Sequence, residues 1–104
     1  MHFLVTAYDG TDSEAAKRRL SVREQHLDNV KKRIGAGTHL FGAALLDNDN
    51  NMIGSIMIVD YPSKEELETE WLGNEPYVIG KVWQEIDIKP CIVPDFFLNK
   101  GELY

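Results

Sequence analysis

The sequence predicts an α+β domain in which an antiparallel sheet carries helices on one face. Apolar and β-branched runs typical of strands cover residues 2–8, 38–47, 51–61 and 81–90. Helix start signals precede two other regions, one before residue 36 and one after residue 62, and the polar turn "DNDNN" joins the second and third strands as a hairpin. The resulting order, β-α-β-β-α-β, is that of the split βαβ or ferredoxin-like arrangement.

Length and composition restrict the class of protein. A chain of 104 residues fits one domain, and a hydrophobic content of 43% is typical of a folded chain. The net charge is −6 and no block of Lys or Arg is present, so nucleic acid is not an expected partner. The N-terminus reads as a strand rather than a signal peptide, and no apolar run approaches 18 residues, which predicts a cytoplasmic protein without a membrane partner. Cys91 is the only cysteine, which excludes an internal disulfide.

The region before residue 36 contains two successive capping boxes, "TDSE" at 11–14 and "SVRE" at 21–24. A single helix has no use for the second one. The pattern therefore predicts a short helix near 13–20, a break at Ser21 and a main helix over 22–35.

The second helix is predicted over residues 63–72, with Ser63 as the N-cap and Glu66 three residues later. The final strand alternates with period two until Pro90, which ends it. Val82 begins its apolar face, whereas Trp83 falls on the face that is otherwise charged.

The third strand is apolar on both faces, since Met57 and Val59 alternate with Ile56 and Ile58. Helices on one side of the sheet leave the other side uncovered, so we expect a second copy of the chain to bind there and form a homodimer. The tail over 93–104 has no periodicity but contains three consecutive large apolar side chains, which predicts packing on the partner subunit. A frayed tail is the alternative.

The main predicted helix places charged groups among apolar ones. Arg23 falls in the same sector as Leu27, Val30 and Ile34, and His26 lies at its edge. In one interpretation Arg23 forms a structural ion pair and His26 is half-buried with its nitrogens satisfied. In the other, this side of the helix ends at a pocket, and the two side chains form part of its wall.

Several stretches resemble the YCII-related (YciI-like) family of small α+β proteins, which share the dimeric α/β-barrel fold. They are "RLSVREQHL", "LFGAALLDNDNNMIGSIMIVDYPS", "NEPYVIGKVWQEIDIKP" and "HFLVTAYDG". The similarity extends to about residue 92 and implies a domain over 1–92. It also implies a site that joins His26 to an acidic residue, with Glu75-Pro76-Tyr77 in the place of the family's usual Asp-Pro-Tyr. Ala43-Ala44 replaces the Gly-Pro step typical of the second strand.

Such a site would carry out proton transfer. A carboxylate such as Glu75 can orient a histidine, so that His26 accepts a proton from a weakly acidic C–H or O–H and returns it elsewhere. Arg23 would hold the anionic oxygen of a substrate, and Tyr77 and Ser55 would orient it. This predicts an isomerase or lyase type of enzyme acting on a small organic acid or phenol, which needs neither metal nor redox cofactor.

Other interpretations remain open at this level. Asp47 competes with Glu75 as the acid, or contributes to substrate binding. The same pocket could belong to a ligand-binding or interaction module without turnover, or, by analogy of fold alone, to a cofactor-free oxygenase. "DNDNN" opens like a calcium loop, but Met52 and Ile58 occupy the positions that require Gly and Glu. His2 and His39 show no ligand spacing with His26, so no metal site is expected.

Overall fold

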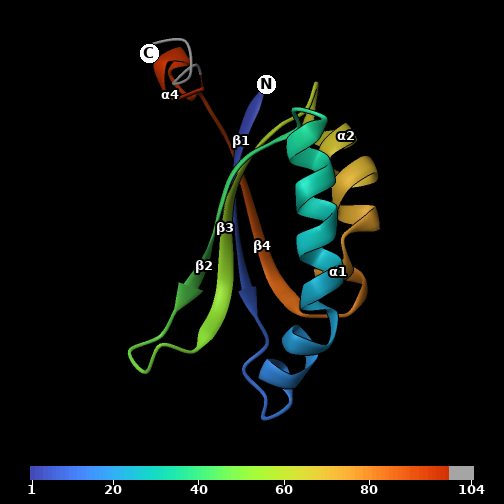
Figure 1. Ribbon diagram of the computed structural model, residues 1–104, viewed down its shortest axis with the longest axis vertical. Helices are drawn as coiled ribbons and strands as arrows, with labels where there is room; N and C mark the ends of the chain where they lie inside the picture. Colours follow the sequence, from blue (N-terminus) through green and yellow to red (C-terminus); the bar gives the residue numbers. More distant parts are fainter. Residues whose placement is uncertain (99–104) are drawn as a thin grey trace.

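A computed structural model describes residues 1–98 and contains a four-stranded antiparallel sheet with its helices on one face (Figure 1). The strands are β1 (His2–Asp9), β2 (His39–Leu46), β3 (Met52–Asp60) and β4 (Trp83–Cys91), in the spatial order β2-β3-β1-β4. The predicted α+β fold class with its ferredoxin-like strand order is confirmed. The central pair, β1 and β3, contributes Phe3, Val5, Met57 and Val59 to the core.

Helix α1 (Ala15–Gly35) forms one half of the helical layer. The other half is a connected series of short helices rather than the single helix expected over 63–72: α2 (Lys64–Glu66), the π-helical turn η1 (Leu67–Trp71), η2 (Leu72–Asn74) and α3 (Pro76–Ile79). Ser63 caps the series as predicted, because its hydroxyl oxygen accepts a hydrogen bond from the Glu66 amide at 3.1 Å. Changes of helix type then bring both Trp71 and Glu75 into the buried layer.

The predicted break at Ser21 is wrong, because α1 runs unbroken through this position. Ser21 is a mid-helix residue whose hydroxyl donates to the Arg18 carbonyl oxygen at 2.7 Å. The helix begins after Glu14, whose side chain makes no capping bond, while Asp12 accepts a bond from the Glu14 amide. A serine followed by a glutamate at the third position is therefore compatible with a helix interior.

The most buried face of α1 is not the apolar sector of Leu27, Val30 and Ile34. Ala15, Arg19 and His26 are buried, whereas Leu20 is 66% exposed and the neighbouring Arg23 is exposed too. Successive helical residues are about 100° apart, so the stripe of Leu and Ile side chains lies roughly one residue step away from the face that contacts the sheet. The helix packs through polar side chains because the sheet and the α3 segment supply partners for them.

Trp83 departs from the predicted alternation of the last strand. The pairing of β1 with β4 shifts between Tyr8 and Asp9, so that Tyr8 faces Glu85 while Asp9 faces Trp83. The extra residue in β4 is a bulge that turns Trp83 towards the helices. Val82 and Trp83 are consequently both buried.

The sheet face opposite the helices has no covering element among residues 1–98, apart from the segment that leads to α4 (Asp95–Leu98) at its end (Figure 1). Phe41 and Tyr8 are exposed there, and Ile56 and Ile58 are partly so. The predicted dimer surface and tail packing remain predictions, and residues 99–104 of that tail lie outside the described part of the chain. Within that part, no helix combines the length and apolar character needed to cross a membrane.

Replacing Ser21 and Ser63 with Ala tests the two cap assignments. Ser21→Ala should stabilise the protein by about 0.5 kcal/mol, because Ala is the better residue in a helix interior. Ser63→Ala should destabilise it by about 1 kcal/mol, because it removes a capping bond. Urea denaturation of the two variants measures both effects, and a loss of stability in Ser21→Ala would contradict the continuous helix.

Candidate active site

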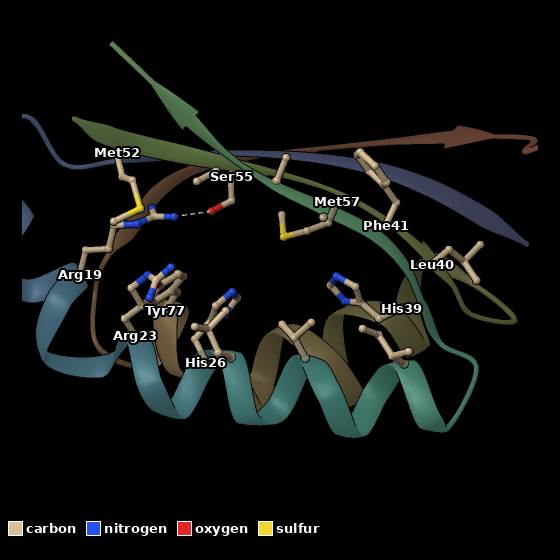
Figure 2. Close-up of a pocket in the computed structure, with 16 residues that line it drawn as sticks. Arg19, Arg23, His26, His39, Leu40, Phe41, Met52, Ser55, Met57 and Tyr77 are labelled. Atoms are coloured by element: carbon tan, nitrogen blue, oxygen red, sulfur yellow. Dashed lines mark hydrogen bonds between the residues drawn. The ribbon is translucent and has the colours of Figure 1, made fainter. Parts of the chain in front are cut away.

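A cavity of about 270 Å³ opens between α1 and the β2–β3 side of the sheet (Figure 2). One group of lining residues is polar, and comprises Arg19, Arg23, His26, His39, Ser55 and Tyr77. The remaining wall is mainly apolar, and includes Leu27, Val30 and Ile34 of α1. The apolar sector of α1 therefore faces this cavity together with Arg23 and His26, as in the interpretation that ends this side of the helix at a pocket.

His26 and Glu75 form the buried pair at the centre of the site. The Nδ1 atom of His26 lies 2.5 Å from Oε1 of Glu75, whose side chain is completely buried. Since the ionised carboxylate only accepts hydrogen bonds, Nδ1 carries the proton and Nε2 remains for a ligand. His26 lines the cavity and Glu75 lies behind it, outside the lining residues.

Four donors satisfy the Glu75 carboxylate. Oε1 accepts from His26 and from the Tyr77 amide at 3.2 Å, and Oε2 accepts from Arg33 Nη1 at 2.7 Å and Trp71 Nε1 at 3.2 Å. Burial alone would raise the pKa of the Glu75 carboxyl, but the bond and charge of His26, the Tyr77 amide and the charge of Arg33 together lower that pKa below its usual value of 4.5. Glu75 is therefore a fixed anion that orients His26.

A second buried ion pair anchors the start of α1. Arg19 Nη1 donates to both carboxylate oxygens of Asp9, at 2.8 and 3.0 Å, and Nη2 donates to Ser55 Oγ at 3.0 Å. Trp83 Nε1 also donates to Ser55 Oγ, at 3.2 Å. The hydroxyl proton of Ser55 remains for another acceptor, and Ser55 lines the cavity.

Tyr77 connects the two ion pairs. Its ring stacks on His26 with centroids 3.9 Å apart, and the Arg19 guanidinium carbon lies 4.8 Å from the Tyr77 ring centroid. Burial raises the pKa of the Tyr77 phenol against the lowering effect of Arg19 and Arg23, so the hydroxyl remains a donor at neutral pH.

Arg23 is the exposed cation of the site. It forms no salt bridge to any residue within 1–98. Figure 2 shows it at the same end of the cavity as Arg19 and Tyr77. Its guanidinium is thus available to an anionic ligand.

The structure brings most of the sequence-predicted site residues together but separates one of them. His26, Glu75, Tyr77, Ser55 and Arg23 form one constellation, as described above. Asp47 lies in the β2–β3 turn, where Oδ1 accepts from the amides of Asp49 at 2.8 Å and Asn51 at 3.0 Å. Asp47 is not among the residues that line the cavity. The carboxylate that contacts His26 is that of Glu75.

Sequence reasoning missed Arg19, Asp9, Arg33 and Trp71. Arg19 precedes His26 by seven residues, a spacing that places both on one helix face, and this signal was available in the sequence. The pairing of Arg33 with Glu75 spans 42 residues and has no local signal. Within residues 1–98, no three His, Cys, Asp or Glu side chains converge as a metal site would require.

The sheet order and the buried histidine–carboxylate pair define a small ferredoxin-like α+β protein with a polar cavity between helix and sheet. A family model described as the YCII-related domain matches residues 1–92. The chain belongs to this YCII-related family, and the similarity expected from the sequence is confirmed.

Two relatives agree with this assignment. Protein YciI of Escherichia coli is 29% identical over 96 residues, covering 86% of this chain and 95% of the relative. Derivative of benzaldehyde biosynthesis cluster protein C of Emericella nidulans is 30% identical over 86 residues, covering 75% of this chain and 87% of the relative.

Two solved structures share the fold. The 5-chloro-2-hydroxyhydroquinone dehydrochlorinase TftG of Burkholderia phenoliruptrix, in complex with 2,5-dihydroxybenzoquinone, has a TM-score of 0.76 at 19% identity, covering 91% of this chain and 97% of that chain. A dimeric ferredoxin-like protein from an uncultured marine organism has a TM-score of 0.52 at 15% identity, covering 88% and 94% of the two chains.

Replacing Glu75 with Gln should destabilise the protein at neutral pH by about 3 kcal/mol, because the partly buried Arg33 loses its countercharge. Because the folded-state pKa of Glu75 lies below 4.5, its ionisation stabilises the fold above that pH. This stabilisation is lost as the pH falls through the folded-state pKa, so the difference between wild type and Glu75→Gln should shrink in acid.

Urea denaturation at pH 7 and at successively lower pH measures this difference. Glu70→Gln serves as the matched control, because Glu70 is exposed and should show little effect at any pH. A wild-type-like stability of Glu75→Gln at pH 7 would contradict the role of the carboxylate as a required buried anion.

Proposed function

We propose that this protein is an enzyme that transfers protons on a small organic acid or phenol, as an isomerase or a lyase does. The observation that carries the proposal is the 2.5 Å contact between His26 Nδ1 and the buried Glu75 carboxylate, on the wall of a cavity that also holds an exposed arginine. His26 is the catalytic residue, and Glu75 is a positioning residue that acts through it.

The proposed reaction uses groups already placed around the cavity. Nε2 of His26 accepts a proton from an acidic C–H or O–H of the bound substrate, while Glu75 holds the ring and offsets the charge that develops on it. Arg23 stabilises the oxyanion of the substrate, and the Tyr77 hydroxyl donates a hydrogen bond to it. The protonated His26 then returns the proton at another atom, or to a leaving group.

The names of two similar proteins support aromatic compounds as the first class of substrate to test. One structural neighbour is named as a dehydrochlorinase of a chlorinated hydroxyhydroquinone, and one relative is named for a benzaldehyde biosynthesis cluster. A dehydrochlorination removes a proton and a chloride from one molecule, and this is chemistry that a single histidine base can assist. A binding module without turnover is the competing function, and the same experiments separate the two.

We also propose that the protein is a homodimer through the sheet face that carries Ile56 and Ile58. Those side chains stand opposite Thr6 and Leu4 of β1, on the face turned away from the helices. One structural neighbour, with a TM-score of 0.52, is described as a dimeric ferredoxin-like protein. The tail that begins at Val93 would pack on the partner subunit.

A panel of small phenols, including 5-chloro-2-hydroxyhydroquinone, tests turnover. Wild type should convert at least one member or exchange one of its C–H protons with deuterated solvent, which NMR detects. His26→Asn should lower the rate by ~100-fold or more, the contribution typical of general acid–base catalysis. Conversion that is unchanged in His26→Asn would refute the assignment of His26.

Binding is measured separately with benzoate as the probe. Benzoate should shift the His26 imidazole signals in a nitrogen NMR spectrum, and Arg23→Ala should weaken this binding by ~10-fold, as expected for one charge-assisted bond. Lys17→Ala is the matched control, because Lys17 is an exposed cation of α1 that does not line the cavity. Binding without any turnover across the phenol panel would favour the ligand-binding module.

Light scattering tests the proposed dimer. The wild type should contain two chains per particle at micromolar concentration, and Ile56→Asp should produce monomers, because two carboxylates would be buried without partners at the interface. Leu20→Asp is the control, since Leu20 is 66% exposed on α1, away from the sheet face. A monomeric wild type would refute the sheet-face dimer.

A further inference from the structure

His39 is a second imidazole on the cavity wall, and the proposed reaction does not use it. It is the first residue of β2 and is only 4% exposed, yet its Nδ1 atom is buried with no hydrogen-bond partner among residues 1–98. A buried polar atom left without a hydrogen-bond partner destabilises the fold. Because Nδ1 has almost no accessible surface, a ligand in the cavity would reach this ring through Nε2.

The surroundings hold the ring in the cavity. Trp71 contacts it edge to face, with centroids 6.1 Å apart. A Cβ atom at Gly42, on the same strand, would lie only 3.2 Å from Nε2 of His39, so the glycine provides room for the ring. Figure 2 shows His39 projecting from β2 into the space between α1 and the sheet.

Burial and the nearby charges keep this imidazole neutral. Burial lowers the pKa of His39, and the positive charge of Arg33 and the neighbouring His26 lower it further, against a smaller opposite effect of Glu75. A neutral imidazole presents one N–H donor and one acceptor nitrogen. It suits an uncharged hydroxyl or carbonyl group better than an anion.

The cavity therefore has two chemically different ends. Arg23, Arg19 and Tyr77 lie together at one end, and His39 lies towards the other end (Figure 2). His26 lies between these ends. Apolar side chains, among them Val30 and Met57, complete the wall along the length of the cavity.

We infer that His39 is a ligand-binding residue that hydrogen-bonds a neutral hydroxyl or carbonyl oxygen of a ligand whose anionic group is held by Arg23. The ligand class is then a small ring or short chain with an anion at one end and an uncharged oxygen at the other. This inference rests on the proposed function, because it requires the anion to bind at Arg23. It narrows the substrate class, since a simple monocarboxylate or phenol leaves His39 without a partner.

Calorimetry with benzoate, 3-hydroxybenzoate and 4-hydroxybenzoate tests the inference. At least one hydroxybenzoate should bind the wild-type protein ~10-fold more tightly than benzoate, as one added hydrogen bond allows. His39→Leu should remove this preference and retain benzoate binding. Arg23→Ala should weaken all three probes together.

The outcomes separate this inference from the proposed function. Benzoate binding without a hydroxybenzoate preference, or a preference that persists in His39→Leu, overturns the role of His39 and leaves the anion site intact. Failure of all three probes to bind overturns the anion site and this inference with it. Nitrogen NMR of the wild type provides a readout that does not depend on the folding of a variant: the His39 ring signals should shift with the preferred hydroxybenzoate and not with benzoate, and equal responses overturn the inference.

Discussion

The Glu75 carboxylate is the group on which the arrangement of the helical layer depends. A carboxylate with no exposed surface is tolerated only when its charge and both oxygens are matched. The matching groups come from α1, η1 and the first turn of α3, through His26, Arg33, Trp71 and the Tyr77 amide. These segments must therefore converge on one point, and this convergence sets the orientation of His26 at the cavity wall.

A second polar contact determines how α1 meets the sheet. The pair of Arg19 and Asp9, extended by Ser55, attaches the start of the helix to β1 and β3. The hydrogen bonds of this contact hold α1 in a fixed position relative to the sheet. Leu27 and Val30 therefore line the space between α1 and β2 and do not fill it. A helix that packed through its Leu and Ile stripe would close this space. The cavity is therefore a consequence of the polar packing of α1.

The sequence was informative where local patterns decide the structure. The strand alternation, the hairpin turn and the Ser63 cap reflect period and turn chemistry, and each is present in the structure. The burial of Arg19 and His26 depends on Asp9, Ser55 and Glu75, which are distant in sequence, so the apolar pattern of α1 alone does not predict it. The burial of Trp83 depends on a register shift between strands, which no single strand encodes. The resemblance to the family implied the pairing of His26 with Glu75. The structure adds that His26 lines the cavity, whereas Glu75 does not.

Arg33 links the two imidazoles of the site. It pairs with Glu75, which holds Nδ1 of His26. Burial lowers the pKa of His39, and the positive charge of Arg33 lowers it further. One histidine therefore contacts a carboxylate, while the other sits among apolar and cationic neighbours and stays neutral. Two titratable groups of the same kind can have different roles in one site when their electrostatic surroundings differ. We propose such a division here: His26 would exchange a proton, His39 would recognise an uncharged oxygen, and Arg33 contributes to the surroundings of both.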